Sequence, residues 1–319
     1  MATDVLVINH TRDVVARMLS EGFVLHHVAG ADLAADVLPP LPPGIRAILT
    51  GVPPVPVTDH LMAVLPELEI IANFGAGYDA VDAAAAARRG IMVTHTPGVL
   101  NEEVADLAIG LLLSTVRRIP QAWDFARSGH WGSHEFPLSP SLQGRRVGLL
   151  GLGGIGRAIA RRCEGFGVEI DYHTRRAVPD VPYRHVPDLL EFARGIDVLV
   201  ASVPGGAATR GLIGEAVLDA LGPDGVLINI GRGSVVDEAA LIRVLDRGGL
   251  LAAGLDVLAD EPRIPEGLRD RDNVVILPHV GGATVANRDR IGVLQARNIL
   301  SWFAGRGPVT PVPETPVRG

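Results

Sequence analysis

The chain has 319 residues, of which 47% are hydrophobic and 20% are charged, and its formal net charge is -7. This length exceeds one ordinary hydrophobic core, so we expect a well-packed soluble protein of two domains. The negative charge and the lack of a basic cluster exclude nucleic acid and anionic membranes as expected partners, and no apolar run is long enough to span a bilayer.

Two residue types are scarce enough to restrict the chemistry. All 29 basic residues are arginine, which excludes mechanisms that need a side-chain amine, such as Schiff bases and phosphate binding by a P-loop lysine. The single cysteine, Cys163, can form no internal disulfide and fits a reducing cytoplasm. Residues 1–10 lack a charged stretch followed by a long apolar run, so we interpret them as a first strand rather than a targeting segment.

The first hundred residues alternate short apolar stretches with helix-like stretches. Strands are predicted at Val5–Asn9, Phe23–Val28, Ala47–Thr50, Glu69–Asn73 and Ile91–Thr94. Helices are predicted at Asp13–Leu19, Asp59–Val64 and Asp82–Arg88. This alternation is typical of βα units on a parallel sheet, and we take the proline cluster at 39–43 as a loop within the same domain.

A break at Pro97-Gly98 precedes a helix predicted over Asn101–Arg118, which we interpret as the bridge into a second domain. The last predicted helix, Arg288–Phe303, follows that domain in sequence but should dock back on the first. The proline-rich residues 308–316 are expected to form an extended tail. Six further strands are predicted in between, at Val147–Leu150, Glu169–Tyr172, Val198–Val203, Gly225–Ile230, Ala252–Val257 and Val274–Leu277.

A glycine-rich turn lies near the middle of the chain. The sequence Gly151-Leu152-Gly153-Gly154-Ile155-Gly156 follows the apolar stretch 147–150 and precedes a helix-like stretch at 157–162. A strand, a G-x-G-x-x-G turn and a helix start together let backbone N–H groups and the positive helix end face a pyrophosphate. The turn therefore predicts a dinucleotide site that begins well inside the chain, with another domain ahead of it.

Three polar residues follow later strands closely: Arg232, Glu261 and His279. The carboxyl ends of strands in a doubly wound sheet face the ligand crevice, so we expect these side chains to meet there. An arginine offers a planar fork to a carboxylate. A glutamate beside a histidine favours the imidazolium and raises its pKa, which suits an acid that protonates a carbonyl oxygen. Each placement taken singly also fits a purely structural role.

Several motifs in this order resemble the D-isomer-specific 2-hydroxyacid dehydrogenases, most closely their glyoxylate/hydroxypyruvate reductase branch. Besides the glycine turn, they are Gly75-Ala76-Gly77-Tyr78-Asp79, Thr96-Pro97-Gly98-Val99-Leu100, Val104-Ala105-Asp106-Leu107-Ala108, Asn229-Ile230-Gly231-Arg232-Gly233, Asp256–Pro262 and Pro278-His279. The resemblance implies an α/β fold of two Rossmann-like doubly wound domains with the active site in the interdomain cleft. Residues 1–99 plus 286–319 would form the substrate-binding domain and residues 100–285 the dinucleotide-binding domain, through which the family usually dimerises.

The resemblance also implies residue roles. His279 would be the general acid/base, Glu261 its orienting and pKa-raising partner, and Arg232 the anchor of the substrate carboxylate. Substrate binding would involve Val52, Ala76, Gly77, Arg232 and His279. Cofactor binding would involve Val104, Gly151, Leu152, Gly153, Gly154, Ile155, Gly156, Thr174, Arg175, Arg176, Val203, Pro204, Thr209, Ile230, Gly231, Arg232, Asp256, His279 and Gly282, with Asp256 at the nicotinamide carboxamide. No metal is implied.

The choice of cofactor depends on the end of the second strand of the nucleotide domain. An acid normally holds the adenine ribose there, and counting twenty residues from Gly151 reaches Asp171. Similarity to the family instead places the selective position at Thr174, and alternation along a strand turns Asp171 to the other face. Thr174 with Arg175 and Arg176 suits a 2′-phosphate, so NADP(H) is the preferred cofactor and NAD(H) a possible one. The alternative is that the two arginines are only solvated.

We therefore expect a cytoplasmic enzyme that reduces a small 2-oxoacid of the glyoxylate/hydroxypyruvate type with NADPH, and the resemblance implies that it is a homodimer. A first alternative is a bulkier 2-oxoacid such as an aromatic pyruvate, because related enzymes differ in the loops that line the cleft. The second alternative, a cofactor-sensing binding protein like the corepressor branch of the superfamily, is disfavoured because the chain has no added tail or basic surface.

Overall fold

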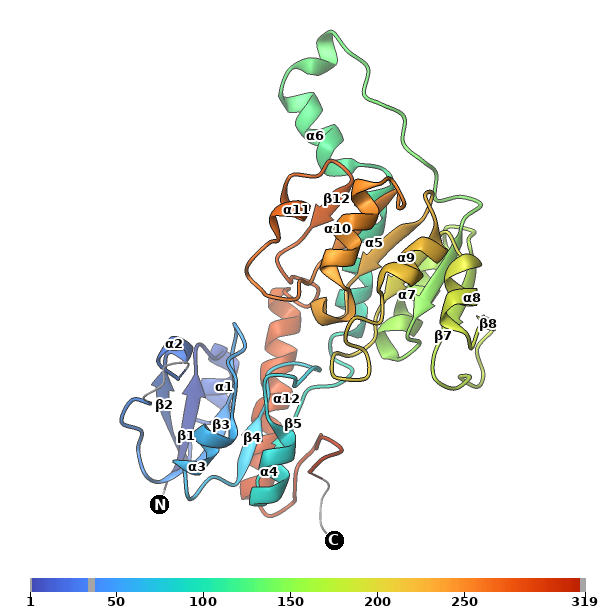
Figure 1. Ribbon diagram of the computed structural model, residues 1–319. Coiled ribbons are helices and arrows are strands. Elements are labelled where there is room, and N and C mark those ends of the chain that lie inside the picture. The colour runs from blue at the N-terminus through green and yellow to red at the C-terminus, as the bar shows by residue number, and fades with distance from the viewer. Residues whose placement is uncertain (1, 34–37, 316–319) are drawn as a thin grey trace. The chain divides into compact units, whose positions relative to one another are not determined.

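The computed structural model describes residues 2–33 and 38–315 of the chain. It divides into two compact units: unit 1 comprises Met1–Leu100 with Thr284–Gly319, and unit 2 comprises Asn101–Ala283. Each unit contains one parallel sheet with helices (Figure 1). In the described ranges every helix is too short or too polar to cross a bilayer.

Unit 1 has a five-stranded parallel sheet in the order β2-β1-β3-β4-β5. Its strands are β1 (Thr3–Ile8), β2 (Phe23–Val28), β3 (Ile45–Leu49), β4 (Ile70–Ala72) and β5 (Met92–Thr94). Its helices are α1 (Asp13–Met18), α2 (Gly30–Leu33), α3 (Asp59–Ala63), α4 (Ala83–Arg89) and α12 (Val285–Phe303). The order 2-1-3-4-5 is the doubly wound order of flavodoxin-like sheets rather than that of the Rossmann fold.

Both faces of the unit 1 sheet are buried, which explains why its strands are almost continuously apolar. Val5 and Val7 of β1 point to one face, where α1 and α12 supply part of the core. Leu6 and Ile8 point to the other face, where α3 and α4 do so. Helix α12 packs against α1 and begins at Val285, three residues earlier than predicted, with the Thr284 side chain as its N-cap.

The C-terminal segment is tied to the edge of the unit 1 sheet. Val312 N–H donates to the carbonyl of Val93 at 3.0 Å, and His95 N–H donates to the carbonyl of Thr310 at 3.1 Å. The segment predicted as an extended tail, 308–316, is thus anchored along β5. Its last residue, Pro316, lies outside the described residues.

Unit 2 has a seven-stranded parallel sheet in the order β12-β11-β10-β9-β6-β7-β8. The sequence order reverses between β6 and β9, which is the switch point where doubly wound sheets bind dinucleotides. Its strands are β6 (Arg146–Leu150), β7 (Glu169–His173), β8 (Arg184–His185), β9 (Val198–Ala201), β10 (Val226–Asn229), β11 (Ala252–Leu255) and β12 (Val274–Ile276). Its helices are α5 (Asn101–Val116), α6 (Ile119–Arg127), α7 (Gly154–Glu164), α8 (Leu189–Arg194), α9 (Glu215–Leu221), α10 (Glu238–Asp246) and α11 (Glu266–Arg269), with short 3-10 turns η1 (His130–Gly132) and η2 (Gly233–Val235).

The predicted α/β class and the two doubly wound parallel sheets are confirmed. The elements that were not predicted include α8, α9 and α10, which bury apolar residues. Strand β8 has two residues, and α6 buries none of its residues. Helix α6 has apolar residues at helical spacing, Ile119, Ala122, Trp123 and Ala126, but it buries none of them, so its periodic pattern was present in the sequence and was not used.

Candidate active site

The glycine turn joins β6 to α7 in unit 2. Gly151 has a φ of +96°, in the left-handed region that favours glycine. A Cβ on Gly156 would lie 2.3 Å from the carbonyl oxygen of Gly151, so α7 can approach the turn only without a side chain there. A Cβ on Gly153 would meet nothing within 4 Å. These three glycines thus provide the turn, the helix packing and the open backbone that a pyrophosphate site needs.

The amino end of α7 is suited to an anion. Its N-cap is Gly153, which has no side chain to bond the first N–H groups of the helix. Over the described ranges, the N–H groups of Gly154 and Ile155 donate to no protein acceptor. Uncapped N–H groups and the positive end of the helix dipole favour a phosphate at this place. The residues present therefore fit a dinucleotide pyrophosphate.

Two glycine substitutions should separate stability from cofactor binding. Gly156→Ala places a methyl group against a backbone carbonyl, so we expect it to lower the free energy of unfolding by about 2 kcal/mol. Gly153→Ala meets no protein atom, so unfolding should change by less than about 0.5 kcal/mol, while the dissociation constant for NADPH should rise about tenfold. Denaturant unfolding and fluorescence titration with NADPH measure the two effects. Equal losses of stability in both variants would contradict this assignment.

The loops after β9 and β10 close on the glycine turn. The Val203 side chain would be 2.9 Å from a Cβ on Gly151, and the Val203 carbonyl oxygen would be 2.7 Å from a Cβ on Gly231. The Thr209 hydroxyl donates to the Pro204 carbonyl at 2.7 Å and holds that loop. One edge of the sheet therefore brings together the predicted cofactor residues Gly151, Val203, Pro204, Thr209 and Gly231.

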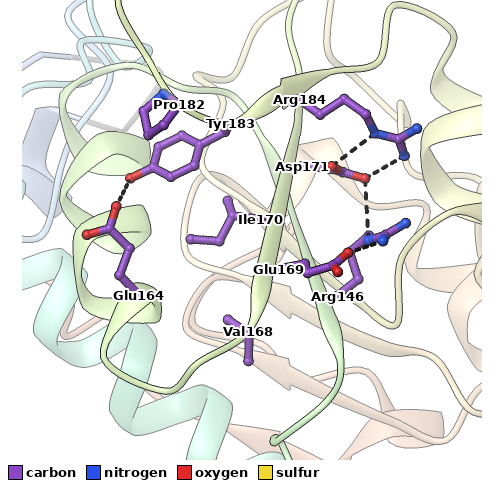
Figure 2. Close-up of a pocket in the computed structure, with 9 residues that line it drawn as sticks. All are labelled: Arg146, Glu164, Val168, Glu169, Ile170, Asp171, Pro182, Tyr183 and Arg184. Atoms are coloured by element: carbon purple, nitrogen blue, oxygen red, sulfur yellow. Dashed lines mark hydrogen bonds and ion pairs between the residues drawn. The ribbon is translucent and has the colours of Figure 1, made fainter.

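Asp171, the acid that simple counting selects for the ribose, is engaged elsewhere. The residue is 4% exposed, and its carboxylate accepts a hydrogen bond from Arg184 Nη2 at 2.7 Å, with Arg146 Nε at 3.9 Å. Figure 2 shows Asp171 between these two arginines, while Tyr183 points away from them toward Glu164. Asp171, Tyr183 and Glu164 line one surface pocket, and none of the residues that line it is a predicted cofactor residue. The geometry supports the interpretation that Asp171 is a structural acid.

The segment after β7 presents two arginines. The Thr174 hydroxyl donates to the carbonyl of Arg176 at 2.6 Å, and His185 Nε2 donates to the carbonyl of Thr174 at 3.0 Å. These bonds hold the backbone of the turn. Arg175 and Arg176 are exposed, and within the described part of the chain neither forms an ion pair. Their charges are therefore available to an anion beside Thr174.

Arg232 lies in the turn between β10 and η2. The buried Asn229 side chain spans this turn, since its Oδ1 accepts the N–H of Gly231 at 3.1 Å and its Nδ2 donates to the carbonyl of Arg232 at 3.0 Å. The Arg232 guanidinium donates to the carbonyl of Gly231 at 2.8 Å. Asn229, which sequence reasoning did not single out, thus sets the backbone from which Arg232 projects.

Glu261 and His279 form a direct pair. His279 Nδ1 lies 2.7 Å from Glu261 Oε2, and the other carboxylate oxygen accepts the N–H of Leu258 at 3.1 Å. Partial burial opposes ionisation of Glu261, but the bond to His279 and the charges of His279 and Arg232 together lower the pKa of this carboxyl below its usual value. The carboxylate form therefore holds the Nδ1 side of the imidazole, which leaves Nε2 for a substrate.

Asp256 holds the backbone around His279. Its buried carboxylate accepts the N–H groups of Val280 at 2.8 Å and Gly281 at 2.9 Å, and its carbonyl accepts the N–H of His279 at 2.8 Å. Burial raises the pKa of Asp256, although the two backbone bonds oppose that rise. His279 has a φ of +53°, an unfavourable value for a residue with a Cβ, and these bonds secure it.

Glu238, which sequence reasoning missed, and the close packing of Gly233 support the Glu261 loop. Glu238, the first residue of α10, accepts the N–H of Ala259 at 2.7 Å. Burial, together with the charges of Asp260 and Glu261, raises the pKa of Glu238 above its usual value. A Cβ on Gly233 would lie 1.9 Å from the carbonyl carbon of Leu258, so this loop packs directly on the turn after Arg232. The sequence around Glu238 indicates only a helix start.

The other predicted positions are distributed as follows. Leu152, Val104 and Ile230 are buried in unit 2, where Val104 packs beside Gly281, and Gly282 is half-buried. Ala76 and Gly77 lie in the loop after β4 of unit 1, and the exposed Val52 lies in the loop after β3. Their assignments to cofactor and substrate remain predictions.

Known proteins resemble the chain over most or all of its length. The family model for the NAD binding domain of D-isomer specific 2-hydroxyacid dehydrogenases matches residues 109–281. An NADPH-dependent glyoxylate/hydroxypyruvate reductase from Sinorhizobium meliloti, solved with NADP and malonate, is 46% identical, with a TM-score of 0.92 and coverage of 100% of this chain and 99% of that one. Glyoxylate/hydroxypyruvate reductase A of Arabidopsis thaliana is 46% identical over 79% of this chain and 81% of its own length. Hydroxyphenylpyruvate reductase of Plectranthus scutellarioides is 44% identical over the same shares.

Proposed function

The chain belongs to the D-isomer-specific 2-hydroxyacid dehydrogenase family, and from this premise we propose that it reduces a small 2-oxoacid of the glyoxylate/hydroxypyruvate type with NADPH. Membership makes it an NAD(P)-dependent oxidoreductase of 2-oxoacids. The observation that carries the proposal is the Glu261–His279 pair, 2.7 Å apart, in the unit that also holds Arg232 and the glycine turn. The pair would supply the proton donor, Arg232 the anchor for the substrate carboxylate, and the glycine turn the binding site for the dinucleotide.

The glycine turn 151–156 would hold the dinucleotide, whose nicotinamide would supply the hydride for the carbonyl carbon of the substrate. His279 delivers the proton from Nε2 to the ketone oxygen, because its Nδ1 is held by Glu261. Glu261 stays ionised and stabilises the imidazolium before that transfer. Arg232 binds the substrate carboxylate with its planar fork and orients the ketone between donor and acid. The product is the 2-hydroxyacid, of D configuration where C2 becomes a stereocentre, as with hydroxypyruvate.

The preference for NADPH rests on the turn after β7. Arg175 and Arg176 are exposed cations beside Thr174, and the nearest acid on that strand, Asp171, is paired with Arg184. A 2′-phosphate would find two positive charges and no competing carboxylate. The Sinorhizobium protein, which shares 46% of its sequence with this chain, is NADPH-dependent.

Neutralising both arginines should change cofactor choice. In Arg175→Gln/Arg176→Gln we expect the Michaelis constant for NADPH to rise about a hundredfold, since each lost charge-assisted bond is worth about 1.5 kcal/mol. The constant for NADH should change by less than about twofold, because no 2′-phosphate is present. Steady-state kinetics with both cofactors measure the effect, and Arg194→Gln on α8, which removes one positive charge from the same unit, serves as a surface control. Equal effects on NADPH and NADH would refute the assignment.

A second candidate substrate is a bulkier 2-oxoacid such as an aromatic pyruvate. It is favoured by the 44% identity to hydroxyphenylpyruvate reductase. NADPH oxidation with glyoxylate, hydroxypyruvate and phenylpyruvate decides between the two, because the preferred substrate should have the higher kcat/KM. Turnover of none of the three would favour a cofactor-sensing binding protein over an enzyme.

We also propose that the protein is a homodimer that associates through unit 2. Helix α6 and the segment after it project from the rest of that unit (Figure 1), and they expose Ile119, Trp123, Trp131 and Leu138. Exposed aromatic side chains on a projecting segment are typical of an interface. A monomeric mass by light scattering would contradict it. A cytoplasmic location stays a prediction based on the single cysteine.

A further inference from the structure

We propose that Asn73 and His95 are positioning residues for 2-oxoacid binding, because they orient three peptide groups of the loop 75–78 toward the substrate carboxylate. The proposal rests on the proposed function and adds two residues to it. Both residues lie in unit 1, Asn73 directly after β4 and His95 directly after β5. Each acts through the loop rather than by touching the substrate.

The carbonyl groups of three successive residues are bonded to these two side chains. Asn73 Nδ2 donates to the carbonyls of Gly75 at 3.2 Å and Gly77 at 2.9 Å. His95 Nδ1 lies 2.7 Å from the carbonyl oxygen of Ala76. A carbonyl only accepts, so Nδ1 carries the hydrogen in this bond. All three carbonyls are therefore directed at protein donors.

The direction of the carbonyls decides the direction of the N–H groups. In a trans peptide the C=O and the following N–H point to opposite sides of the chain. Fixing the carbonyls of residues 75–77 thus turns the N–H groups of Ala76, Gly77 and Tyr78 away from Asn73 and His95. Within the described part of the chain, these three N–H groups donate to no protein acceptor. Successive free N–H groups form an anion-binding concavity of the kind that receives a carboxylate.

The side chain of Asn73 is itself fixed. It is 5% exposed, and its Oδ1 accepts a hydrogen bond from the Thr50 hydroxyl at 3.3 Å. The same hydroxyl accepts the N–H of Phe74 at 2.8 Å. Thr50 is in turn held by Gln295 of α12, whose Nε2 donates to its carbonyl at 2.8 Å. The amide of Asn73 therefore has one orientation, with its two donors facing the loop.

His95 is fixed from the other side by the C-terminal segment. Its backbone N–H donates to the carbonyl of Thr310 at 3.1 Å. Its ring meets the ring of Tyr78 edge to face, with centroids 5.3 Å apart, and the Tyr78 hydroxyl donates to Glu314 at 3.1 Å. The donor at Nδ1 is thus placed before any substrate arrives, which lowers the cost of ordering the loop on binding.

The test compares glyoxylate with its uncharged methyl ester at saturating NADPH. Asn73→Asp keeps the shape of the side chain but cannot donate to the loop, and it brings a negative charge near the carboxylate. We expect it to raise the KM for glyoxylate about tenfold, because the hydrogen bonds that orient the anion-binding N–H groups are lost. The KM for the methyl ester and the KM for NADPH should each change by less than about twofold.

His95 offers a second pair of variants in case Asn73→Asp folds poorly. His95→Leu removes the donor and should raise the KM for glyoxylate about fivefold. His95→Asn retains an N–H donor near the Nδ1 position and should restore the KM to within about twofold of the unaltered protein. Thr58→Ala, which removes the N-cap of α3 and no bond to the loop, controls for lost stability and should leave both KM values unchanged.

Titration with oxalate, monitored by calorimetry, is independent of turnover. Weaker oxalate binding in Asn73→Asp and His95→Leu, with normal binding in His95→Asn, supports the proposal. Equal preference for glyoxylate over the ester in all variants, or equal oxalate binding, overturns it. If the unaltered protein reduces no 2-oxoacid, the proposed function is overturned. If the variants still show this order of oxalate affinities, the role of Asn73 and His95 in anion binding is nevertheless supported.

Discussion

Replacing His279 with alanine is expected to lower kcat for 2-oxoacid reduction with NADPH about a thousandfold, within the range of about 10²–10⁴ that general acid catalysis contributes. The ketone oxygen must gain a proton as hydride arrives, and no lysine exists in the chain to replace the imidazole. The dissociation constant for NADPH should change by less than about threefold, because the pyrophosphate cradle at 151–156 is untouched. Stopped-flow single turnover and fluorescence titration separate these effects.

The partner variant Glu261→Gln tests how the histidine is used. It should lower kcat about 10- to 100-fold, since a hydrogen bond to a charged group is worth about 1.5–3 kcal/mol. The carboxyl of Glu261 has a lowered pKa, so the unaltered protein should lose rate as pH drops through that lowered value, and Glu261→Gln should lack this loss. In the unaltered protein the lowered pKa of Glu261 keeps the carboxylate ionised, and the pair is lost only as pH drops through that lowered value.

If His279→Ala keeps a normal kcat, the histidine is not the proton donor, and its bond to Glu261 has only a structural role. Glu238→Gln is the control for loop position. Glu238 accepts a hydrogen bond from Ala259 of the same loop and contacts neither His279 nor the proposed substrate. It should retain the position of the pH profile even if kcat falls. A shifted profile in Glu238→Gln would show that loop position, not the Glu261 charge, controls the histidine.

Replacing Arg232 with glutamine should lower kcat/KM for glyoxylate about a thousandfold. The loss combines two charge-assisted hydrogen bonds to the carboxylate, each worth about 1.5–3 kcal/mol, partly offset by the remaining amide donors. Arg232→Lys should recover only part of it, because an ammonium keeps the charge but not the planar fork. Initial rates over a range of glyoxylate concentrations measure both variants.

Arg243→Gln is the matched control for this series. Arg243 pairs with Glu215 on the surface of α10 and α9, so its loss should leave kcat/KM within about twofold. The assignment of Arg232 fails if its glutamine variant keeps full kcat/KM for glyoxylate. It fails equally if glyoxylate and its methyl ester lose the same factor, since a carboxylate anchor should discriminate between them.

Much of the fold was predictable because its signals are local. A strand buried on both faces must be apolar at nearly every residue, so β1, β6 and β10 stand out in the sequence, with ends shifted by one or two residues. The glycine turn is recognisable because each glycine meets a separate backbone requirement. By contrast, β8 pairs through two residues and leaves no periodic pattern. Helix α6 has a helical apolar pattern but no buried face.

The three proposed catalytic residues were also identifiable, since strand ends in a parallel sheet converge on one edge. What surrounds them was not. Asn229 beside Arg232 reads as one more residue of an apolar strand, and Glu238 reads as the start of a helix. Only the packing of Gly233 on Leu258 brings the helix start to the loop of Glu261.

The sequence by itself determined the α/β class, the dinucleotide turn and the family, because these depend on residues close together along the chain. Tertiary structure alone decided which polar groups are already engaged. Asp171 is paired with Arg184, thirteen residues away, which engages its carboxylate away from the proposed ribose site and leaves Arg175 and Arg176 as the proposed determinants of cofactor choice. Asn73 and His95 meet the loop 75–78 from two different strands. Such bonds form only when the sheet brings distant residues together, and no spacing along the chain encodes them.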